Sequence, residues 1–166
     1  FINLYSEPGR GTTVRIYLRR DEAVAVEPAV TAGSAGATAV PGGTECVLLV
    51  EDEPSLLQLG GQVLGRLGYR VLAASDPDAA LALVRAGGER PDVLVTDVIM
   101  PGMNGRDLHA RLESELPGLR CLYMSGYTDN VIAHLGVLED GVNFLQKPFS
   151  ARELGQRLRQ LLDAPG

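Results

Sequence analysis

Short apolar runs alternate with amphipathic segments over most of this chain. Residues 46–50 form a continuous apolar run that stops at acidic residues, and residues 93–96 form a similar run that stops at Asp97. Continuous apolarity over this length is typical of a strand buried on both faces, as in a parallel sheet. The other predicted strands cover residues 69–74, 120–124 and 142–146. The pattern therefore predicts five strands.

Helix-like patterns separate these strands and cover residues 54–67, 77–86, 106–115, 129–138 and 151 onward. Pro54 is typical of a first helical turn, and Asp76 and Ser150 are typical N-caps. Four apolar residues are predicted to share one face of the first helix, namely Leu56, Val63, Leu64 and Leu67. The predicted buried stripe of the second helix consists of Ala80, Leu83 and Val84. Five strand–helix units in about 120 residues predict an α/β fold with a doubly wound parallel sheet.

The first 44 residues follow a different pattern. Residues 1–19 alternate at period two around a turn at 6–11, which predicts a β-hairpin. Two strands alone are marginal in water, so we expect the hairpin to belong to a larger sheet and the chain to be cut from a longer one. Residues 20–44 are rich in small residues without a period and are predicted to be a flexible linker. The predicted organisation is thus hairpin 1–19, linker 20–44 and α/β domain 45–166.

Composition narrows the class of protein. The net charge of the 166 residues is −6, and all of it falls in residues 45–166, which argues against a nucleic-acid-binding face. No apolar run reaches the length of a membrane helix. Cys46 and Cys121 lie in apolar runs without disulfide or metal spacing, which fits small core residues in a cytoplasmic protein. Of the 15 basic residues only Lys147 is a lysine.

Polar residues cluster where the predicted strands end. The residues at these ends are Glu51, Asp52, Asp97, Ser125 and Lys147. The carboxyl ends of parallel strands share one edge of the sheet, where such folds bind ligands. Three neighbouring carboxylates need a cation, and oxygen ligands alone favour Mg²⁺. A lysine and a hydroxyl are suitable partners for phosphoryl oxygens, so the cluster predicts phosphoryl transfer, with an aspartate as a candidate nucleophile.

These motifs together resemble the receiver domain of two-component response regulators. The resemblance rests on residues 50–53, on Asp97 followed by 100–105, on 124–127 and on 147–149, all in order within 45–163. It implies a flavodoxin-like fold with strand order 2-1-3-4-5.

The resemblance also implies a role for each site residue. Asp97 would accept a phosphoryl group from a phosphohistidine, and Ser125 and Lys147 would bind the phosphoryl oxygens. Mg²⁺ would be held by Glu51, Asp52, Asp97 and the backbone carbonyl of Ile99. Ser125 and Phe144 would form a switch that changes the helix-four and strand-five face, which is also the expected surface of a weak homodimer. Pro148 would be structural, following the lysine in a cis peptide.

Residues 5–18 resemble the end of a histidine kinase ATP-binding domain. A kinase end, a linker and a receiver, in that order, is the layout of a hybrid sensor histidine kinase whose missing sensor region would provide any membrane anchor. The fragment lacks the kinase core, so we expect it to catalyse phosphoryl transfer only onto its own Asp97. The implied partners are a histidine kinase phosphohistidine domain, in the same or another chain, and a downstream histidine phosphotransfer protein.

Alternative readings remain beside this one. The chain could be a degenerate receiver that binds a partner without phosphorylation, although its complete site argues against this. A haloacid-dehalogenase-like phosphatase would need an acid two residues after Asp97, where Ile99 stands. A DNA-binding response regulator would need an output domain. His109 and His134 are predicted to be structural, and Phe144 could be an ordinary core residue.

Overall fold

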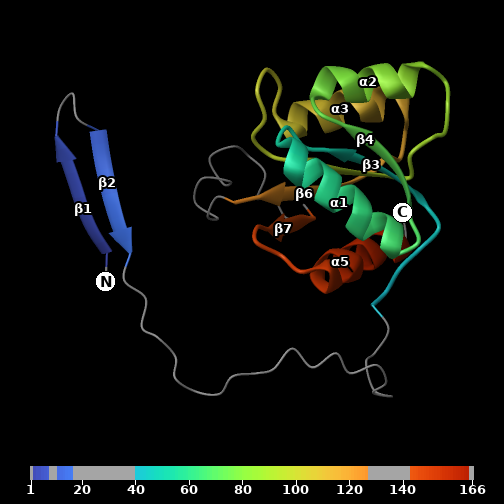
Figure 1. Ribbon diagram of the computed structural model, residues 1–166. Helices are drawn as coiled ribbons and strands as arrows, with labels where there is room; N and C mark the ends of the chain where they lie inside the picture. Colours follow the sequence, from blue (N-terminus) through green and yellow to red (C-terminus); the bar gives the residue numbers. More distant parts are fainter. Residues whose placement is uncertain (1, 8–10, 17–39, 127–142, 165–166) are drawn as a thin grey trace, which may run out of the picture. The chain divides into compact units, whose positions relative to one another are not determined.

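The computed structural model describes residues 2–7, 11–16, 40–126 and 143–164 of a chain that divides into two compact units, residues 1–37 and 38–166 (Figure 1). In the first unit, β1 (Ile2–Glu7) and β2 (Gly11–Ile16) pair antiparallel. The pairing places Ile2 opposite Ile16. The predicted hairpin is therefore confirmed.

The second unit contains a five-stranded sheet. Its strands are β3 (Cys46–Val50), β4 (Arg70–Ala74), β5 (Val93–Asp97), β6 (Arg120–Ser125) and β7 (Phe144–Gln146). All neighbours pair in parallel in the spatial order β4-β3-β5-β6-β7. Counted from β3, this is the predicted order 2-1-3-4-5 of a flavodoxin-like fold.

The helices described in this unit are α1 (Pro54–Arg66), α2 (Pro77–Arg85), α3 (Gly105–Glu115) and α5 (Ala151–Asp163). The predicted caps are present, because Asp76 accepts the backbone N–H of Ala79 and Ser150 forms a capping box with Glu153. The helix predicted over 129–138 lies outside the described residues. Among the described helices, none is long and apolar enough to cross a bilayer.

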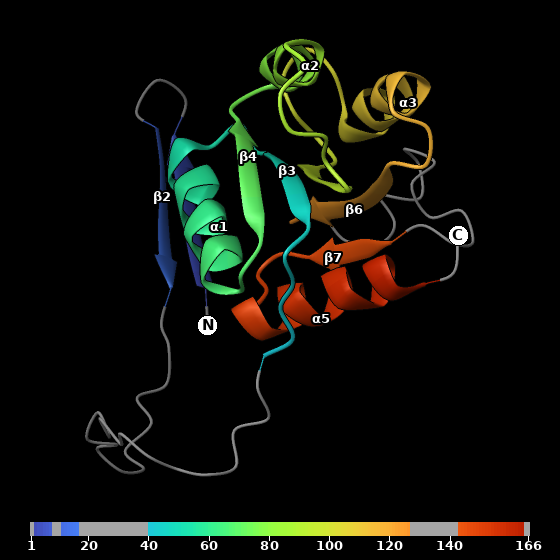
Figure 2. The ribbon, with the colours of Figure 1, turned by 90° about the vertical axis from the view of Figure 1, so that its right-hand side faces the viewer.

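The helices cover both faces of the sheet, α2 and α3 on one face and α1 and α5 on the other (Figures 1 and 2). One core cluster joins the sheet to α2 and α3 through residues such as Leu81, Leu108 and Leu112. The other cluster joins the sheet to α1 and α5 through Leu64 and Leu158, which are both fully buried. Strands buried on both faces explain the continuous apolar runs of the sequence.

Leu83, which is predicted to be buried, is exposed instead, and Leu56 on the predicted apolar face of the first helix is exposed as well. Leu83 of α2 is 39% exposed and Leu56 of α1 is 44% exposed. The buried stripe of α2 is centred on Ala80 and Leu81, so Leu83 lies on the flank of the helix that the sheet does not cover. Leu56 lies in the first turn of α1, where it lines a pocket instead of packing on the sheet.

The segment before β3 packs on the sheet-bearing unit. The backbone N–H of Gly43 donates to the carbonyl oxygen of Leu67 at 3.1 Å, just after α1. A Cβ added to Gly155 of α5 would lie 2.6 Å from the carbonyl oxygen of Pro41, so the chain passes this helix at close range. Residues 40–44 of the predicted linker therefore contact the α/β unit.

The packing predicts a large difference between two leucine truncations in helices. Replacing the fully buried Leu158 with alanine removes apolar contacts and leaves a cavity, so Leu158→Ala should lower the free energy of unfolding by about 2–5 kcal/mol. The control Leu83→Ala should change it by roughly 0.5 kcal/mol or less, because Leu83 is already exposed. Urea denaturation measures both values, and equal losses would contradict the described core.

Candidate functional site

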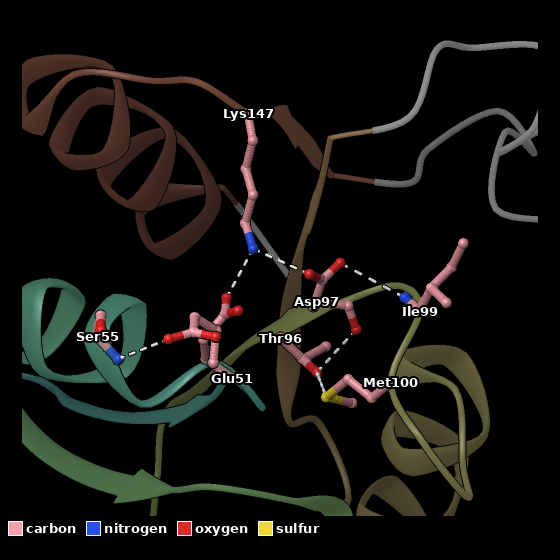
Figure 3. A network of polar contacts seen from close by, with 8 residues as sticks. Glu51, Ser55, Thr96, Asp97, Ile99, Met100 and Lys147 are labelled. Carbon is pink, nitrogen blue, oxygen red and sulfur yellow. Dashed lines mark hydrogen bonds and ion pairs between the residues drawn. The ribbon is translucent and has the colours of Figure 1, made fainter. Parts of the chain in front are cut away.

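Three charged side chains meet where neighbouring strands end. Glu51 follows β3, Asp97 is the last residue of β5, and Lys147 follows β7. The Lys147 ammonium donates to Glu51 Oε2 at 2.7 Å and to Asp97 Oδ2 at 2.9 Å (Figure 3). The only lysine of the chain therefore bridges two carboxylates that are 46 residues apart in the sequence.

This ion-pair network is largely shielded from water. The side chains of Glu51, Asp97 and Lys147 are 4%, 17% and 20% exposed. Burial lowers the pKa of Lys147, but the hydrogen bonds and charges of Glu51 and Asp97 outweigh burial and raise it above the ordinary value. The ammonium is therefore held in its charged form at neutral pH.

The site carries more negative than positive charge. Glu51, Asp52 and Asp97 each offer a carboxylate oxygen, and these oxygens lie within 4.8 Å of one another. One ammonium compensates only part of this charge, and Asp52 is exposed to solvent. A group of oxygen ligands with excess negative charge suits a hard divalent cation such as Mg²⁺, so the residues present fit such an ion.

Backbone contacts hold the strand ends in place. The Lys147 N–H donates to the Ser125 carbonyl at 2.8 Å, which fixes the end of β7 beside the end of β6. The Ile99 N–H donates to Asp97 Oδ1 at 3.4 Å, and the Thr96 hydroxyl donates to the Asp97 carbonyl at 3.1 Å. The Lys147–Pro148 peptide is cis, as the resemblance implies.

A protein-family model also matches most of the second unit. The model of the response regulator receiver domain matches residues 47–159. This chain belongs to the response regulator receiver family. The second unit is thus a receiver domain of two-component signalling. Receiver domains bind Mg²⁺ in an acidic pocket, and the carboxylate group described above is such a pocket.

Individual relatives extend the comparison. Sensor kinase CckA of Brucella abortus is 33% identical over 167 residues, which cover 98% of this chain and 18% of that protein. The probable transcriptional regulatory protein TcrX of Mycobacterium tuberculosis is 38% identical over 120 residues, covering 72% of this chain and 50% of that protein. The chain therefore spans at most half the length of these two relatives.

Solved structures share the fold of the receiver domain. The receiver domain of the hybrid histidine kinase CckA has a TM-score of 0.59 and 33% identity, covering 70% of this chain and 98% of that one. The chemotaxis protein CheY4 of Vibrio cholerae, crystallised at low pH, has a TM-score of 0.63 and 29% identity. The match covers 72% of this chain and 100% of that one. Receiver domains of two-component systems interact with histidine kinases or with phosphotransfer domains.

The two expected switch residues lie at opposite ends of adjacent strands. Ser125 ends β6 and is fully buried. Phe144 begins β7, is half-buried and packs against the core cluster on the α2–α3 side. Most of the segment between them, residues 127–142, lies outside the described residues, as does the face expected to mediate a homodimer. The switch and the core reading of Phe144 both stay predictions.

His109 has structural contacts in the receiver domain. Its Nε2 lies 2.9 Å from the Leu119 carbonyl oxygen, which can only accept, so Nε2 carries a proton. Its Nδ1 lies 3.0 Å from the hydroxyl of Tyr123 on β6. The imidazole thereby ties α3 to β6, in the structural role that the sequence predicts. His134, the other histidine, lies outside the described residues.

Sequence reasoning missed two features beside the site. A pocket of about 460 Å³ lies between α1 and the start of α5 and reaches Glu51 and Lys147. Apolar side chains dominate its lining, among them Leu56, Leu59 and Phe149, so one side of the ion-pair network faces apolar surroundings. The second feature is Gly105 at the start of α3, which lies directly against Asp97. Periodicity carries no signal for either feature, because both depend on distances between elements.

The excess of negative charge predicts the effect of removing one carboxylate. Asp97 repels two carboxylates and attracts one ammonium, and each such pair contributes about 3 kcal/mol at 5 Å and an effective dielectric constant of about 20. With divalent cations chelated, Asp97→Asn should therefore raise the free energy of unfolding by roughly 1–3 kcal/mol. Glu113→Gln, an exposed carboxylate on α3, is the control and should change it by roughly 0.5 kcal/mol or less. A clear loss of stability in Asp97→Asn, measured by urea denaturation, would contradict this charge balance.

Proposed function

We propose that Asp97 is the phosphoacceptor of a phosphorelay and takes its phosphoryl group from a phosphohistidine. The observation that carries the proposal is the contact of the Lys147 ammonium with Asp97 Oδ2 at 2.9 Å, inside a group of three carboxylates. This arrangement combines a nucleophilic carboxylate with a fixed positive charge beside it. The complete set of charged residues disfavours a receiver that acts without phosphorylation.

The chemistry follows from these positions. A carboxylate oxygen of Asp97 attacks phosphorus, and the bond between phosphorus and the donor imidazole nitrogen breaks. The bonding electron pair stays on that nitrogen, and the donor leaves as a neutral imidazole whose other ring nitrogen carries the proton. The product is an aspartyl phosphate. Lys147 would then neutralise charge on the transferred phosphoryl oxygens, and the Ser125 hydroxyl would donate to one of them. Positioning and charge neutralisation therefore supply most of the catalysis.

The proposed cofactor is Mg²⁺. Glu51, Asp52 and Asp97 would hold the ion together with the backbone carbonyl of Ile99, and the ion would supply further neutralisation of the phosphoryl charge. The oxygen ligands and their separation of at most 4.8 Å support this choice. The exposure of Asp52 gives the ion a path from solvent.

The phosphorylated state would be signalled through Ser125 and Phe144. Ser125 is buried at the end of β6, and its hydroxyl would move toward a phosphoryl group on Asp97. The half-buried ring of Phe144 would turn into the space that this movement changes. The face between helix four and strand five would then differ between the two states.

The parent protein is proposed to be a hybrid sensor histidine kinase. The similarity to sensor kinase CckA covers 98% of this chain and so includes residues ahead of the receiver domain. Residues 1–19 would be the end of a kinase ATP-binding domain, 20–44 a linker and 45–166 the receiver. A downstream histidine phosphotransfer protein is the proposed next carrier. Both free cysteines are buried thiols, which supports a reducing, cytoplasmic location.

Intact-mass analysis after incubation with acetyl phosphate and Mg²⁺ tests the proposed function. We expect one phosphoryl adduct on the wild type, strongly reduced without Mg²⁺ and absent from Asp97→Asn, because the nucleophilic oxygen is lost. Glu113→Gln serves as the charge-matched control and should be modified like the wild type. An adduct of equal yield on Asp97→Asn would contradict the assignment of Asp97.

Mg²⁺ should also stabilise the fold by mass action. At a concentration of about 100 times its dissociation constant, the ion should raise the free energy of unfolding by about 2.7 kcal/mol. Asp52→Asn should lose most of this gain, because it replaces a charged carboxylate ligand with a neutral amide without disturbing the Lys147 contacts. Denaturation with and without Mg²⁺ measures the effect. Equal stabilisation of the wild type and Asp52→Asn would exclude Asp52 as a ligand.

A further inference from the structure

Gly105, the first residue of α3, lies against the backbone of Asp97. A Cβ added to Gly105 would be 2.3 Å from the Asp97 carbonyl oxygen and 3.2 Å from its carbonyl carbon. It would also be 3.0 Å from Cγ2 of Thr96. Distances below 3.0 Å essentially do not occur for real Cβ atoms. Any side chain at position 105 therefore requires α3 or the end of β5 to move.

The neighbouring atoms have little freedom to make way. The nearest atom is a backbone oxygen, and the Thr96 hydroxyl already donates to it at 3.1 Å. The Gly105 N–H donates to the Val98 carbonyl at 3.0 Å, and the Val98 N–H donates to the Met124 carbonyl at 2.9 Å. The start of α3 is thus tied to the end of β5 and, through it, to β6.

Backbone conformation does not account for this glycine. The glycines with positive φ among the described residues are Gly68, Gly87, Gly102 and Gly118, and Gly105 is not one of them. Within a helix, glycine is less favourable than alanine. Local propensity would therefore favour alanine at position 105, and the close approach to Asp97 is the remaining reason for a glycine.

We propose that Gly105 is a positioning residue for phosphoryl transfer onto Asp97. This inference rests on the proposed function of Asp97. The absent side chain lets α3 dock on the Asp97 peptide and sets where the carboxylate stands relative to Lys147. An alanine would displace the peptide or the helix by about 0.7 Å, the difference between 2.3 Å and the 3.0 Å limit. A misplacement near 1 Å can reduce the rate of such a reaction by about 100-fold.

Three glycine-to-alanine variants separate positioning from a general loss of stability. Gly105→Ala introduces the contact with Asp97. Gly155→Ala introduces a comparable backbone contact, 2.6 Å from the carbonyl oxygen of Pro41, on α5 beside the segment that leads into β3. Gly61→Ala adds a methyl group on α1 with nothing within 4 Å. All three change the same atoms, and only the first changes the surroundings of Asp97.

The experiment measures the rate of adduct formation with acetyl phosphate at saturating Mg²⁺, by intact mass. Circular dichroism and urea denaturation give the folded fraction and the free energy of unfolding of each protein. If Gly105→Ala is incompletely folded in buffer, all four proteins are compared in trimethylamine N-oxide, which favours the folded state. Rates are expressed per folded molecule.

We expect Gly105→Ala to lower the rate per folded molecule by about 10- to 100-fold. Gly155→Ala should keep the wild-type rate within about twofold even where it lowers stability, and Gly61→Ala should keep the wild-type rate and be at least as stable as the wild type. An unchanged rate in Gly105→Ala would overturn the proposal, as would rate losses in Gly105→Ala and Gly155→Ala that follow their losses of stability. A wild type that forms no adduct would instead overturn the function proposed for Asp97, and this inference with it.

Discussion

The contact of one ammonium with two carboxylates organises the functional end of this receiver domain. Lys147 reaches Glu51 at 2.7 Å and Asp97 at 2.9 Å, and Asp52 adds a third carboxylate nearby. The site thus holds an uncompensated negative charge in a partly desolvated place. Buried charge of this kind is costly unless it is paired, so the site is arranged to bind positive charge. A divalent cation would relieve this charge, and Lys147 together with such an ion would supply the positive charge that a phosphoryl group needs.

The fold supplies the positions that this contact needs. Parallel strands end at one edge of the sheet, so residues from three distant parts of the sequence meet there. The described helices cover the two faces of the sheet and hold the strands (Figure 2). Docking of α3 on the Asp97 peptide, and of β7 on β6 through the Lys147 N–H, fixes the strand ends in register. The rigid scaffold thereby keeps the carboxylate and the ammonium in contact before any substrate arrives.

Much of this arrangement could be predicted from the sequence because its signals are local. Continuous apolar runs indicated buried parallel strands, and the acidic residues and lysine directly after them indicated the site. The burial predicted for Leu83 is wrong because helical periodicity defines a face but not how far the neighbouring sheet covers it. The close approach of Gly105 to Asp97 and the packing of residues 40–44 depend on distances between elements, which no local pattern encodes.

The most direct test of the account is to locate the modified residue chemically. Borohydride reduces an aspartyl phosphate to homoserine, so the phosphorylated protein is reduced, digested and sequenced by mass spectrometry. We predict homoserine at position 97, with Glu51 and Asp52 unchanged. Homoserine at another position, or an adduct that resists reduction, would contradict the claim that Asp97 is the phosphoacceptor.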